Sequence, residues 1–530
     1  MAPVRRDAVG IGRRGGPPPE NRDSFDMRIH TLLDTAGQRH PHRIAVVDGV
    51  HRWTYEQLRR RSVNLAGVFR AQGLRPGDRI AVRAGGAGFA TILFAAAYAD
   101  LTLAPLSAGM RPFQLRMVLA DIAPALVIGI DPASVDVPAP AWSPARFGEI
   151  LSRLDGPVAD SRPTDAGRID RDPGPPALLM YTSGSSARPK GVVCPHDRVL
   201  FATRAIGQVL GYRPDDVVLS CVPPSFDYGL YQILLTTAAG ARLETLGPGE
   251  GVALLERINS SRATIVPVVP EIATALLRLA ARTSPAVAQS VRMFTSTGAR
   301  MPPRLADGLR SAFPGAAVVH MYGLTECKRA TILEPDGDLV RPGSVGRAIP
   351  GTVVHVVDRR GRPLPAGRVG EVVVEGGNVM AGYWRDRQLG AATFRVTANG
   401  RRLHTGDRGH FDVDGYLYLH GRRDDVFKHR GVRSSVAELE AAALDIAGVE
   451  GAAVVPPDEE GPLTVVVATA LPEDDVLTEL ARRLEPAKVP ARCVVVDALP
   501  LTPHGKADRT RIRAIVQAHR SSASVQMRRS

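Results

Sequence analysis

The segment ALLMYTSGSSARPKG occupies residues 177–191 and joins an apolar run to a loop of small polar residues. Its first five residues are typical of a buried strand, because apolar side chains follow one another without alternation. The loop places Gly184 among hydroxyl side chains and ends at Lys190. Hydroxyls, backbone N–H groups and one ammonium can bind polyphosphate oxygens. Pro189 breaks the Walker pattern, and an ordinary Ser/Gly surface loop remains the alternative for this segment alone.

Strands and helices alternate on both sides of this segment. Residues 43–49 and 78–84 have the apolar pattern of strands, and residues 53–73 have apolar side chains at helical spacing. This alternation predicts an α/β fold with mainly parallel sheets covered on both faces. The most apolar stretch, residues 89–106, contains Asp100 and predicts a buried helix followed by a strand rather than a membrane span.

Changes in composition and in the expected secondary structure along the chain define the expected domains. We expect a disordered leader over 1–24 and a large domain over 25–423, whose part from about 343 to 423 is rich in short strands with Gly/Asp turns. Residues 424–515 predict a small α+β domain, followed by a flexible tail over 516–530.

Composition limits the function classes. The net charge of +13 lies partly in the two ends of the chain and is otherwise mixed with acids, so nucleic acid is not the expected ligand. Four widely spaced cysteines without a CxxC pair argue against a zinc ribbon or a disulfide framework, and a reducing cytoplasm fits them. No apolar run is long enough to span a membrane.

Further blocks follow the Ser/Gly loop in a fixed order. They are STGAR (296–300), MYGLTE (321–326), GSVGRAIPG (343–351), GEVVVEG (370–376), MAGYW (380–384), HTGD (404–407), DGYLYLHGRRDDVFKHRG (414–431) and LTPHGKADR (501–509). In this order and spacing the blocks resemble the adenylate-forming superfamily, which includes acyl-CoA synthetases, peptide-synthetase adenylation domains and luciferases. The resemblance covers about residues 30–515.

The resemblance implies a fold and an activity. It implies a large N-terminal domain of parallel-type α/β subdomains with a β-rich subdomain, and a small, mobile C-terminal domain. ATP and Mg²⁺ would activate an acid as its acyl adenylate with release of pyrophosphate. The acyl group would then pass to a thiol, either coenzyme A or the phosphopantetheine of a separate, acidic acyl or peptidyl carrier protein. We expect such a reaction in specialised metabolism.

The resemblance also assigns the nucleotide site. Thr325 would contact the α-phosphate, Glu326 would bind Mg²⁺, Asp407 and Arg422 would hold the ribose, and Arg433 would face the phosphates. Taken alone, Glu326 is an ordinary surface acid, and the Arg/Asp residues form a solvated ion-pair network in the alternative interpretation. The full expected ATP-binding set is Thr182, Ser183, Gly184, Ser185, Ser186, Lys190, Tyr322, Gly323, Asp407, Arg422 and Arg433.

Lysine is rare in this chain. Only five of its 67 basic residues are lysines, and one of them, Lys506, lies near the C-terminus after a Pro/Gly turn. Arginine does not replace lysine where a compact, mobile charge must enter a tight site. By resemblance Lys506 is the catalytic lysine of the mobile domain, and Asp424 matches the hinge. Ala187 and His504 stand where relatives commonly have glycine and asparagine.

The segment PPSFDYGLYQ (223–232) resembles the part of amino-acid-activating relatives that holds the substrate ammonium, and Asp227 occupies the acidic position. Similar segments occur in relatives that activate simple acyl groups, so both substrate classes stay open. For Lys328 and Arg329, a surface salt bridge is favoured over contact with a second anionic group. The expected pocket residues are Asp227, Tyr228, Tyr231, Thr297, Gly298 and Met321.

One alternative belongs to another class of protein. A non-catalytic relative could bind a ligand or regulate a partner with the same fold. The joint presence of Lys506, Glu326, Asp407 and Arg422 favours the enzyme, because a chain released from catalysis has no need to keep all four.

Overall fold

The computed structural model describes residues 28–110, 112–133, 139–157, 175–182, 190–247, 250–282, 289–397, 400–422, 426–429, 432–457, 461–484, 488–502 and 506–527. The expected leader over 1–24 and the centre of the Ser/Gly loop lie outside these residues. No helix of the described chain is both long and apolar enough to cross a membrane.

A nine-stranded sheet forms one half of the large domain. Its six central strands pair in parallel, while the strands at its two edges pair antiparallel. In spatial order the strands are β15 (Arg347–Ala348), β14 (Thr331–Ile332), β13 (Ala317–Tyr322), β12 (Met293–Ser296), β11 (Ile265–Val268), β9 (Val217–Ser220), β10 (Arg242–Thr245), β1 (Ile44–Val47) and β2 (Arg52–Thr54).

A second sheet has seven strands and carries the start of the Ser/Gly loop. Five of its strands pair in parallel, and β8 and β18 extend it antiparallel. The strands in spatial order are β18 (Gly382–Tyr383), β8 (Lys190–Cys194), β7 (Leu178–Thr182), β4 (Thr102–Pro105), β3 (Arg79–Val82), β5 (Leu126–Ile128) and β6 (Ala141–Trp142). The predicted α/β class with mainly parallel sheets is therefore confirmed.

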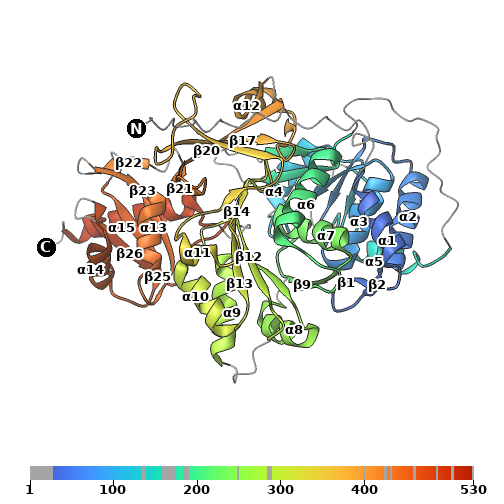
Figure 1. Ribbon diagram of the computed structural model, residues 1–530, viewed down its shortest axis with the longest axis horizontal. Helices are drawn as coiled ribbons and strands as arrows, with labels where there is room; N and C mark the ends of the chain where they lie inside the picture. The colour runs from blue at the N-terminus through green and yellow to red at the C-terminus, as the bar shows by residue number, and fades with distance from the viewer. Residues whose placement is uncertain are drawn as a thin grey trace, which may run out of the picture.

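Helices fill the connections between these strands (Figure 1). Helix α2 begins with a capping box in which Thr54 and Gln57 each accept the other's backbone N–H. Helix α3 is buried along nearly its whole length, which confirms the expected buried helix before β4. The helices of the large domain are α1 (His30–Arg39), α2 (Tyr55–Ala71), α3 (Gly86–Tyr98), α4 (Pro112–Ile122), α5 (Pro144–Ser152), α6 (His196–Leu210), α7 (Asp227–Ala239), η2 (Glu250–Ala253), α8 (Leu254–Ser261), α9 (Pro270–Arg282), α10 (Pro303–Ala312), α11 (Gly337–Val340) and α12 (Arg387–Thr393).

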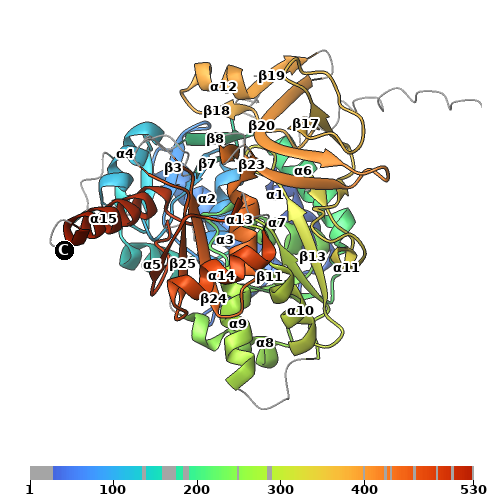
Figure 2. The same cartoon turned by 90° about the vertical axis from the view of Figure 1, so that its left-hand side faces the viewer.

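The third sheet is antiparallel and lies along the top of the molecule in both views (Figure 2). It consists of β16 (Thr352–Val357), β17 (Gly370–Gly376), β20 (Gly400–Phe411), β19 (Phe394–Thr397) and β21 (Leu417–Arg422). The sequence placed all of 343–423 in this β-rich unit. Strands β15 and β18 instead join the two large sheets, because their backbone groups pair with β14 and β8.

The C-terminal elements form a separate group at the left of Figure 1. They are β22 (Val426–His429), β23 (Val432–Ser435), α13 (Val436–Leu444), β24 (Val449–Val455), β25 (Thr464–Thr469), α14 (Glu473–Arg483), β26 (Arg492–Val496) and α15 (Arg509–Met527). The sequence predicted a flexible tail from residue 516, whereas α15 continues to Met527. Ile512 and Val516 are buried against the sheet, so the helix has an apolar face that the polar composition concealed.

An ion-pair cluster ties three strands of the nine-stranded sheet together at their amino ends. Asp216, Thr264 and Arg292 each stand directly before a strand, β9, β11 and β12 respectively. The Asp216 carboxylate accepts two bonds from Arg292, at 2.8 and 2.7 Å, one from Thr264 at 2.8 Å and one from the Arg213 N–H at 2.7 Å. Burial alone would raise the pKa of Asp216, but these bonds outweigh it and hold the pKa below its ordinary value.

Replacing this carboxylate tests its structural weight. Asp216→Ala should lower the free energy of unfolding by about 3 kcal/mol, because it leaves Arg292 and Thr264 without their shared partner. Urea unfolding followed by circular dichroism measures the change. Glu149→Ala, which removes an exposed partner of Arg146, is the matched control and should change stability little. Equal effects of the two variants would contradict the assigned role.

The natural chain and Asp216→Ala also test how the contribution of Asp216 to the free energy of unfolding depends on pH. Because the folded-state pKa of Asp216 lies below that of the unfolded chain, its contribution is complete at neutral pH. It is lost as the pH falls through the folded-state pKa. The stability difference between the natural chain and Asp216→Ala should therefore shrink in acid, and a difference that grows would contradict the assignment.

Candidate active site

Several predicted site residues follow the carboxyl ends of parallel strands. The Ser/Gly loop begins at the carboxyl end of β7, Thr297 and Gly298 follow β12, and residues 323–329 follow β13. Asp227 opens helix α7, which follows β9. Ligands of open α/β sheets bind at this edge, because loops leave the carboxyl ends of neighbouring strands side by side.

The turn from β13 to β14 is closed by a very tight backbone approach. A Cβ on Gly323 would lie 2.1 Å from the Lys328 carbonyl oxygen, so only glycine fits there. The Lys328 N–H donates to Leu324 O at 2.6 Å, and Lys328 has a φ of 61°, in the left-handed region. This turn directs consecutive side chains to different neighbours.

Glu326 points from this turn to the edge of the seven-stranded sheet. Tyr383 Oη donates to Glu326 Oε1 at 2.7 Å, and the Met380 N–H donates to Glu326 O at 2.8 Å. The Lys190 ammonium lies 5.9 Å from the centre of the Tyr383 ring. The carboxylate, the end of the Ser/Gly loop and the MAGYW block therefore meet at one place.

Asp407 lies on β20 of the antiparallel sheet and contacts the last residue of β13. Tyr322 Oη donates to Asp407 Oδ2 at 2.6 Å, and the Asp407 N–H donates to Thr405 Oγ1 at 3.0 Å. Burial and the neighbouring Asp407 raise the pKa of Tyr322, so the phenol stays protonated as a donor. Arg422 is the direct cross-strand partner of Asp407 in the β20–β21 pair. Its side chain lies outside the described residues.

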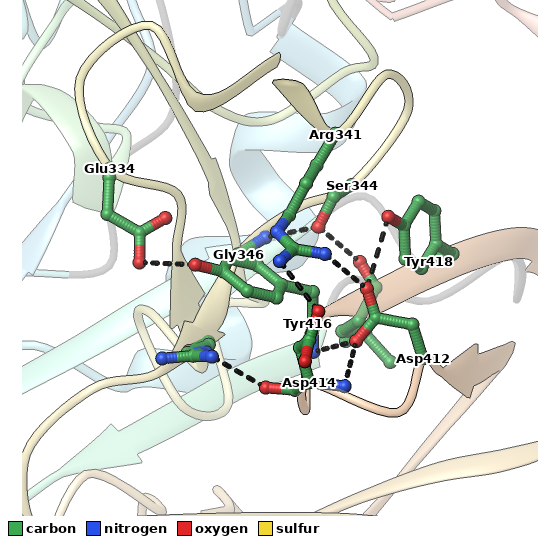
Figure 3. A network of polar contacts seen from close by, with 10 residues as sticks. Glu334, Arg341, Ser344, Gly346, Asp412, Asp414, Tyr416 and Tyr418 are labelled. Atoms are coloured by element: carbon green, nitrogen blue, oxygen red, sulfur yellow. Dashed lines mark hydrogen bonds and ion pairs between the residues drawn. The ribbon is translucent and has the colours of Figure 1, made fainter. Parts of the chain in front are cut away.

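A polar network holds the turn of the β20–β21 hairpin against the segment between β14 and β15 (Figure 3). Arg341 donates to Asp412 at 3.0 Å and to Asp414 at 2.7 Å, and its guanidinium lies 4.0 Å from the centre of the Tyr416 ring. Tyr416 Oη reaches Glu334 at 3.0 Å. The hairpin is therefore fixed at its turn, which holds Asp407 in register beside β13.

The expected acyl-pocket residues lie on α7, just after β12 and on β13, and one contact joins α7 to β12. Tyr228 Oη contacts Thr295 on β12, 2.6 Å from its carbonyl oxygen and 2.7 Å from its hydroxyl. Tyr231, Thr297 and Met321 are buried, and Gly298 is exposed with a φ of 87°. Helix α7 carries Asp227, Tyr228 and Tyr231, the residues after β12 are Thr297 and Gly298, and β13 carries Met321.

The favoured interpretation of Lys328 and Arg329 is wrong. Lys328 is 0% exposed and Arg329 is 5% exposed, so neither forms a surface salt bridge. Arg329 lies 3.7 Å from Asp227, and the Lys328 ammonium lies 3.4 Å from Cys194 Sγ. The turn after β13 directs both side chains inward, which the sequence spacing did not reveal.

Lys506 is not brought to this site. It is exposed, and its described contacts join its backbone to Thr502 in the same loop. The C-terminal elements instead dock on α9 and α10, where Arg304 donates to the carbonyl of Ile446 at 3.1 Å and Arg278 pairs with Glu450. The predicted hinge Asp424, residues 183–189 and the side chains of Thr182 and Arg433 lie outside the described residues.

Two family models match the chain. The AMP-binding enzyme model matches residues 33–384, and the AMP-binding enzyme C-terminal domain model matches residues 438–506. The chain belongs to the AMP-binding enzyme family. The resemblance to the adenylate-forming superfamily is thereby confirmed, and the chain is an AMP-forming ligase.

Curated AMP-binding relatives differ in length. The L-proline--[L-prolyl-carrier protein] ligase of Streptomyces coelicolor is 32% identical over 91% of this chain and 96% of its own length. Tyrocidine synthase 3 of Brevibacillus parabrevis is 26% identical over 92% of this chain, which spans 8% of that protein.

Solved AMP-binding enzymes share the fold. VinN in complex with L-aspartate is 37% identical, with a TM-score of 0.66 over 75% of this chain and 99% of VinN. ATP-bound MatB from Rhodopseudomonas palustris is 26% identical, with a TM-score of 0.78 over 92% of this chain and 99% of MatB.

Sequence reasoning about this AMP-binding chain missed two supporting side chains. Tyr383 bonds Glu326, and Asn378, which is fully buried, donates to the carbonyls of Cys327 at 3.1 Å and Arg329 at 2.8 Å. The available signal was the MAGYW block, which contains Tyr383 and begins two residues after Asn378. The spacing of the motifs did not reveal that this block contacts the turn after β13.

The tight turn is testable by one methyl group. Gly323→Ala should lower the free energy of unfolding by about 1–3 kcal/mol, because the added Cβ collides with the Lys328 carbonyl. Gly148→Ala, in helix α5 with open space around its Cβ, is the control and should be neutral or stabilising. Thermal unfolding measures both, and a neutral Gly323→Ala would contradict the close approach.

Proposed function

We propose that this chain activates the carboxylate of a small acid with ATP, releases pyrophosphate, and passes the acyl group from its adenylate to a thiol. The observation that carries the proposal is the meeting of Tyr322 and Asp407 at 2.6 Å, beside the turn that holds Glu326. Tyr322, Glu326 and Asp407 are all expected to bind the nucleotide or its metal. They come from distant parts of the chain and lie near the end of β13.

The residues around Glu326 fit a magnesium ion. Tyr383 engages one carboxylate oxygen, and within the described chain no cluster of three or more His, Cys, Asp or Glu residues could hold a metal by itself. Mg²⁺ commonly binds one or two carboxylates together with substrate phosphates and water. Bound there, the ion would neutralise charge on the nucleotide phosphates. Tyr383 would keep Glu326 oriented toward it, and Thr325 would donate to the α-phosphate.

Asp407 fits the ribose. Its carboxylate can accept from two neighbouring hydroxyls, while Tyr322 fixes its orientation through one oxygen. Arg422 stands opposite in register and would complete this contact. The remaining proposed ATP contacts are Thr182, Ser183, Gly184, Ser185, Ser186, Lys190, Gly323 and Arg433.

Lys506 would act only after movement of the small domain. Its exposed position and the contacts of Arg304 and Arg278 describe one arrangement of residues 424–515. Rotation about Asp424 would bring the ammonium to the attacking carboxylate and the α-phosphate, then withdraw it for attack by the thiol. Alternation of this kind lets one large domain serve two half-reactions.

The acid and the acceptor are supported by different observations. An amine-bearing acid is supported by Asp227 at the start of α7 and by the VinN complex with L-aspartate. A carrier protein is supported by the carrier-protein ligase among the relatives and by the net charge of +13, which suits an acidic partner. Coenzyme A is the alternative thiol.

Pyrophosphate release tests the proposed function. The protein is mixed with ATP, Mg²⁺ and a panel of amino, aryl and aliphatic acids, and release is measured for each acid. We expect release that depends on at least one acid. Binding of ATP without release across the whole panel would favour the alternative, a non-catalytic ligand-binding or regulatory relative.

Lys506→Arg separates the two half-reactions. Adenylate formation should fall by about 100-fold or more, because the guanidinium cannot take the place of a compact ammonium at the α-phosphate. Thioester formation from supplied acyl adenylate should survive. Lys488→Arg is the matched control, since Lys488 pairs with Glu438 at 2.8 Å and arginine can keep that pair. An equal loss in both half-reactions would show a folding or hinge defect instead.

A further inference from the structure

Two consecutive cations are buried between the two large sheets. Lys328 and Arg329 leave the turn after β13 and reach toward β8 and α7. Their exposed fractions are 0% and 5%. Burying a charge is costly unless an opposite charge or several hydrogen bonds compensate for it. The partners of each cation therefore indicate what the site is built to receive.

Lys328 has no carboxylate partner within the described chain. Its ammonium carries three donors, and its described bond is to Cys194 Sγ at 3.4 Å, with the Tyr231 ring centre 5.9 Å away. Burial raises the pKa of Cys194 despite the nearby ammonium, so the sulfur is a neutral, weak acceptor at neutral pH. The positive charge of Lys328 is left uncompensated by these contacts.

Arg329 has an acidic neighbour at a distance longer than a hydrogen bond. Its guanidinium lies 3.7 Å from Asp227 Oδ2 and 5.0 Å from the centre of the Tyr228 ring. A bonded Arg–carboxylate pair would approach to about 2.8 Å. Asp227 and Arg329 are therefore close enough to share a ligand and loose enough to exchange each other for one.

Three buried hydroxyls, on α7, just before it and at the end of β12, also lack partners among the described residues. The side-chain oxygens of Ser225, Tyr231 and Ser296 are buried and make no hydrogen bond to the described residues. Tyr231 is 2% exposed and lies on α7 beside Lys328, while Ser225 precedes α7 and Ser296 ends β12. Buried hydroxyls normally form hydrogen bonds, so three without a partner in the described chain indicate a polar ligand.

We propose that the acid activated by this chain is an amino dicarboxylic acid, whose ammonium is held by Asp227 and whose second, non-reacting carboxylate is held by Arg329 and Lys328. The proposal rests on the proposed function and names the substrate class of that site. Ligand binding would exchange the loose contact between Asp227 and Arg329 for two closer pairs, and it would give Lys328 its missing anion.

The reacting carboxylate cannot satisfy Lys328 instead. It loses its charge when it becomes the acyl adenylate, so a cation paired only with it would become unpaired during the reaction. Such a contact would stabilise the starting acid over the product and oppose the step. A second carboxylate keeps its charge throughout. An acid without an ammonium would draw Arg329 away and leave Asp227 unpaired.

Matched acids test the substrate class. Pyrophosphate release is measured with L-aspartate and L-glutamate, with their amides L-asparagine and L-glutamine, and with succinate and glutarate, which lack the amine. We expect kcat/KM for one amino dicarboxylic acid to exceed that for its amide and its deaminated analogue by about 100-fold or more, because each analogue leaves a buried charge unpaired. A neutral amino acid or a simple acid that reacts as well as the best amino dicarboxylic acid would overturn the proposal.

Arg329→Gln tests the residue behind the preference. It should raise KM for the amino dicarboxylic acid much more than it lowers kcat, while the amide is affected far less. Lys328→Met should act in the same direction. Arg362→Gln, which removes an exposed cation paired with Asp358, is the matched control and should change KM and kcat for neither substrate. Equal losses for both substrates would assign Arg329 and Lys328 to structure alone and overturn the proposal.

Direct binding distinguishes failure of the proposal from failure of the proposed function. If no acid releases pyrophosphate, isothermal titration of L-aspartate, L-glutamate and their amides into the protein still reports recognition. Binding of an amino dicarboxylic acid that weakens in Arg329→Gln would support the site without the reaction. If neither L-aspartate nor L-glutamate binds, or if each binds as tightly as its amide, the proposed substrate class is overturned.

Discussion

The arrangement of the site depends on the close contact of Gly323 with the carbonyl of Lys328. This contact folds the chain back immediately after β13, so that a turn of a few residues presents side chains in several directions. Glu326 reaches the edge strand β18, Lys328 reaches β8, and Arg329 reaches α7. A wider turn would separate these groups, because their partners belong to different sheets.

The turn also joins parts of the chain that fold as separate layers. Strand β18 crosses from the antiparallel sheet region to pair with β8. Asn378, just before β18, and Tyr383, within it, both donate hydrogen bonds to the turn. The hairpin β20–β21 is fixed independently by Arg341 and its acidic partners. Both attachments hold the site residues in place, while the described C-terminal elements contact the large domain at α9 and α10 and, through α13, near β21.

The sequence predicted the α/β class, the order of the motifs and most of the elements, since these follow from local patterns. Residues 89–106 became the buried helix α3 and strand β4 because an apolar run with one central acid has few other solutions. Helix α15 was underestimated because its apolar positions, Ile512 and Val516, are few among polar neighbours. Lys328 and Arg329 were misplaced because charged residues are exposed in most proteins.

The order of residues establishes which chemical groups this protein carries: a Ser/Gly loop, the acids Glu326 and Asp407, and one lysine near the C-terminus. Which of these groups meet depends on the folded chain. Two adjacent cations read identically in sequence whether they face solvent or the interior. The backbone at Lys328, with its φ of 61° and the glycine contact behind it, turns them inward. Burial then makes their charges costly to leave unpaired, and that cost is what points to an anionic ligand.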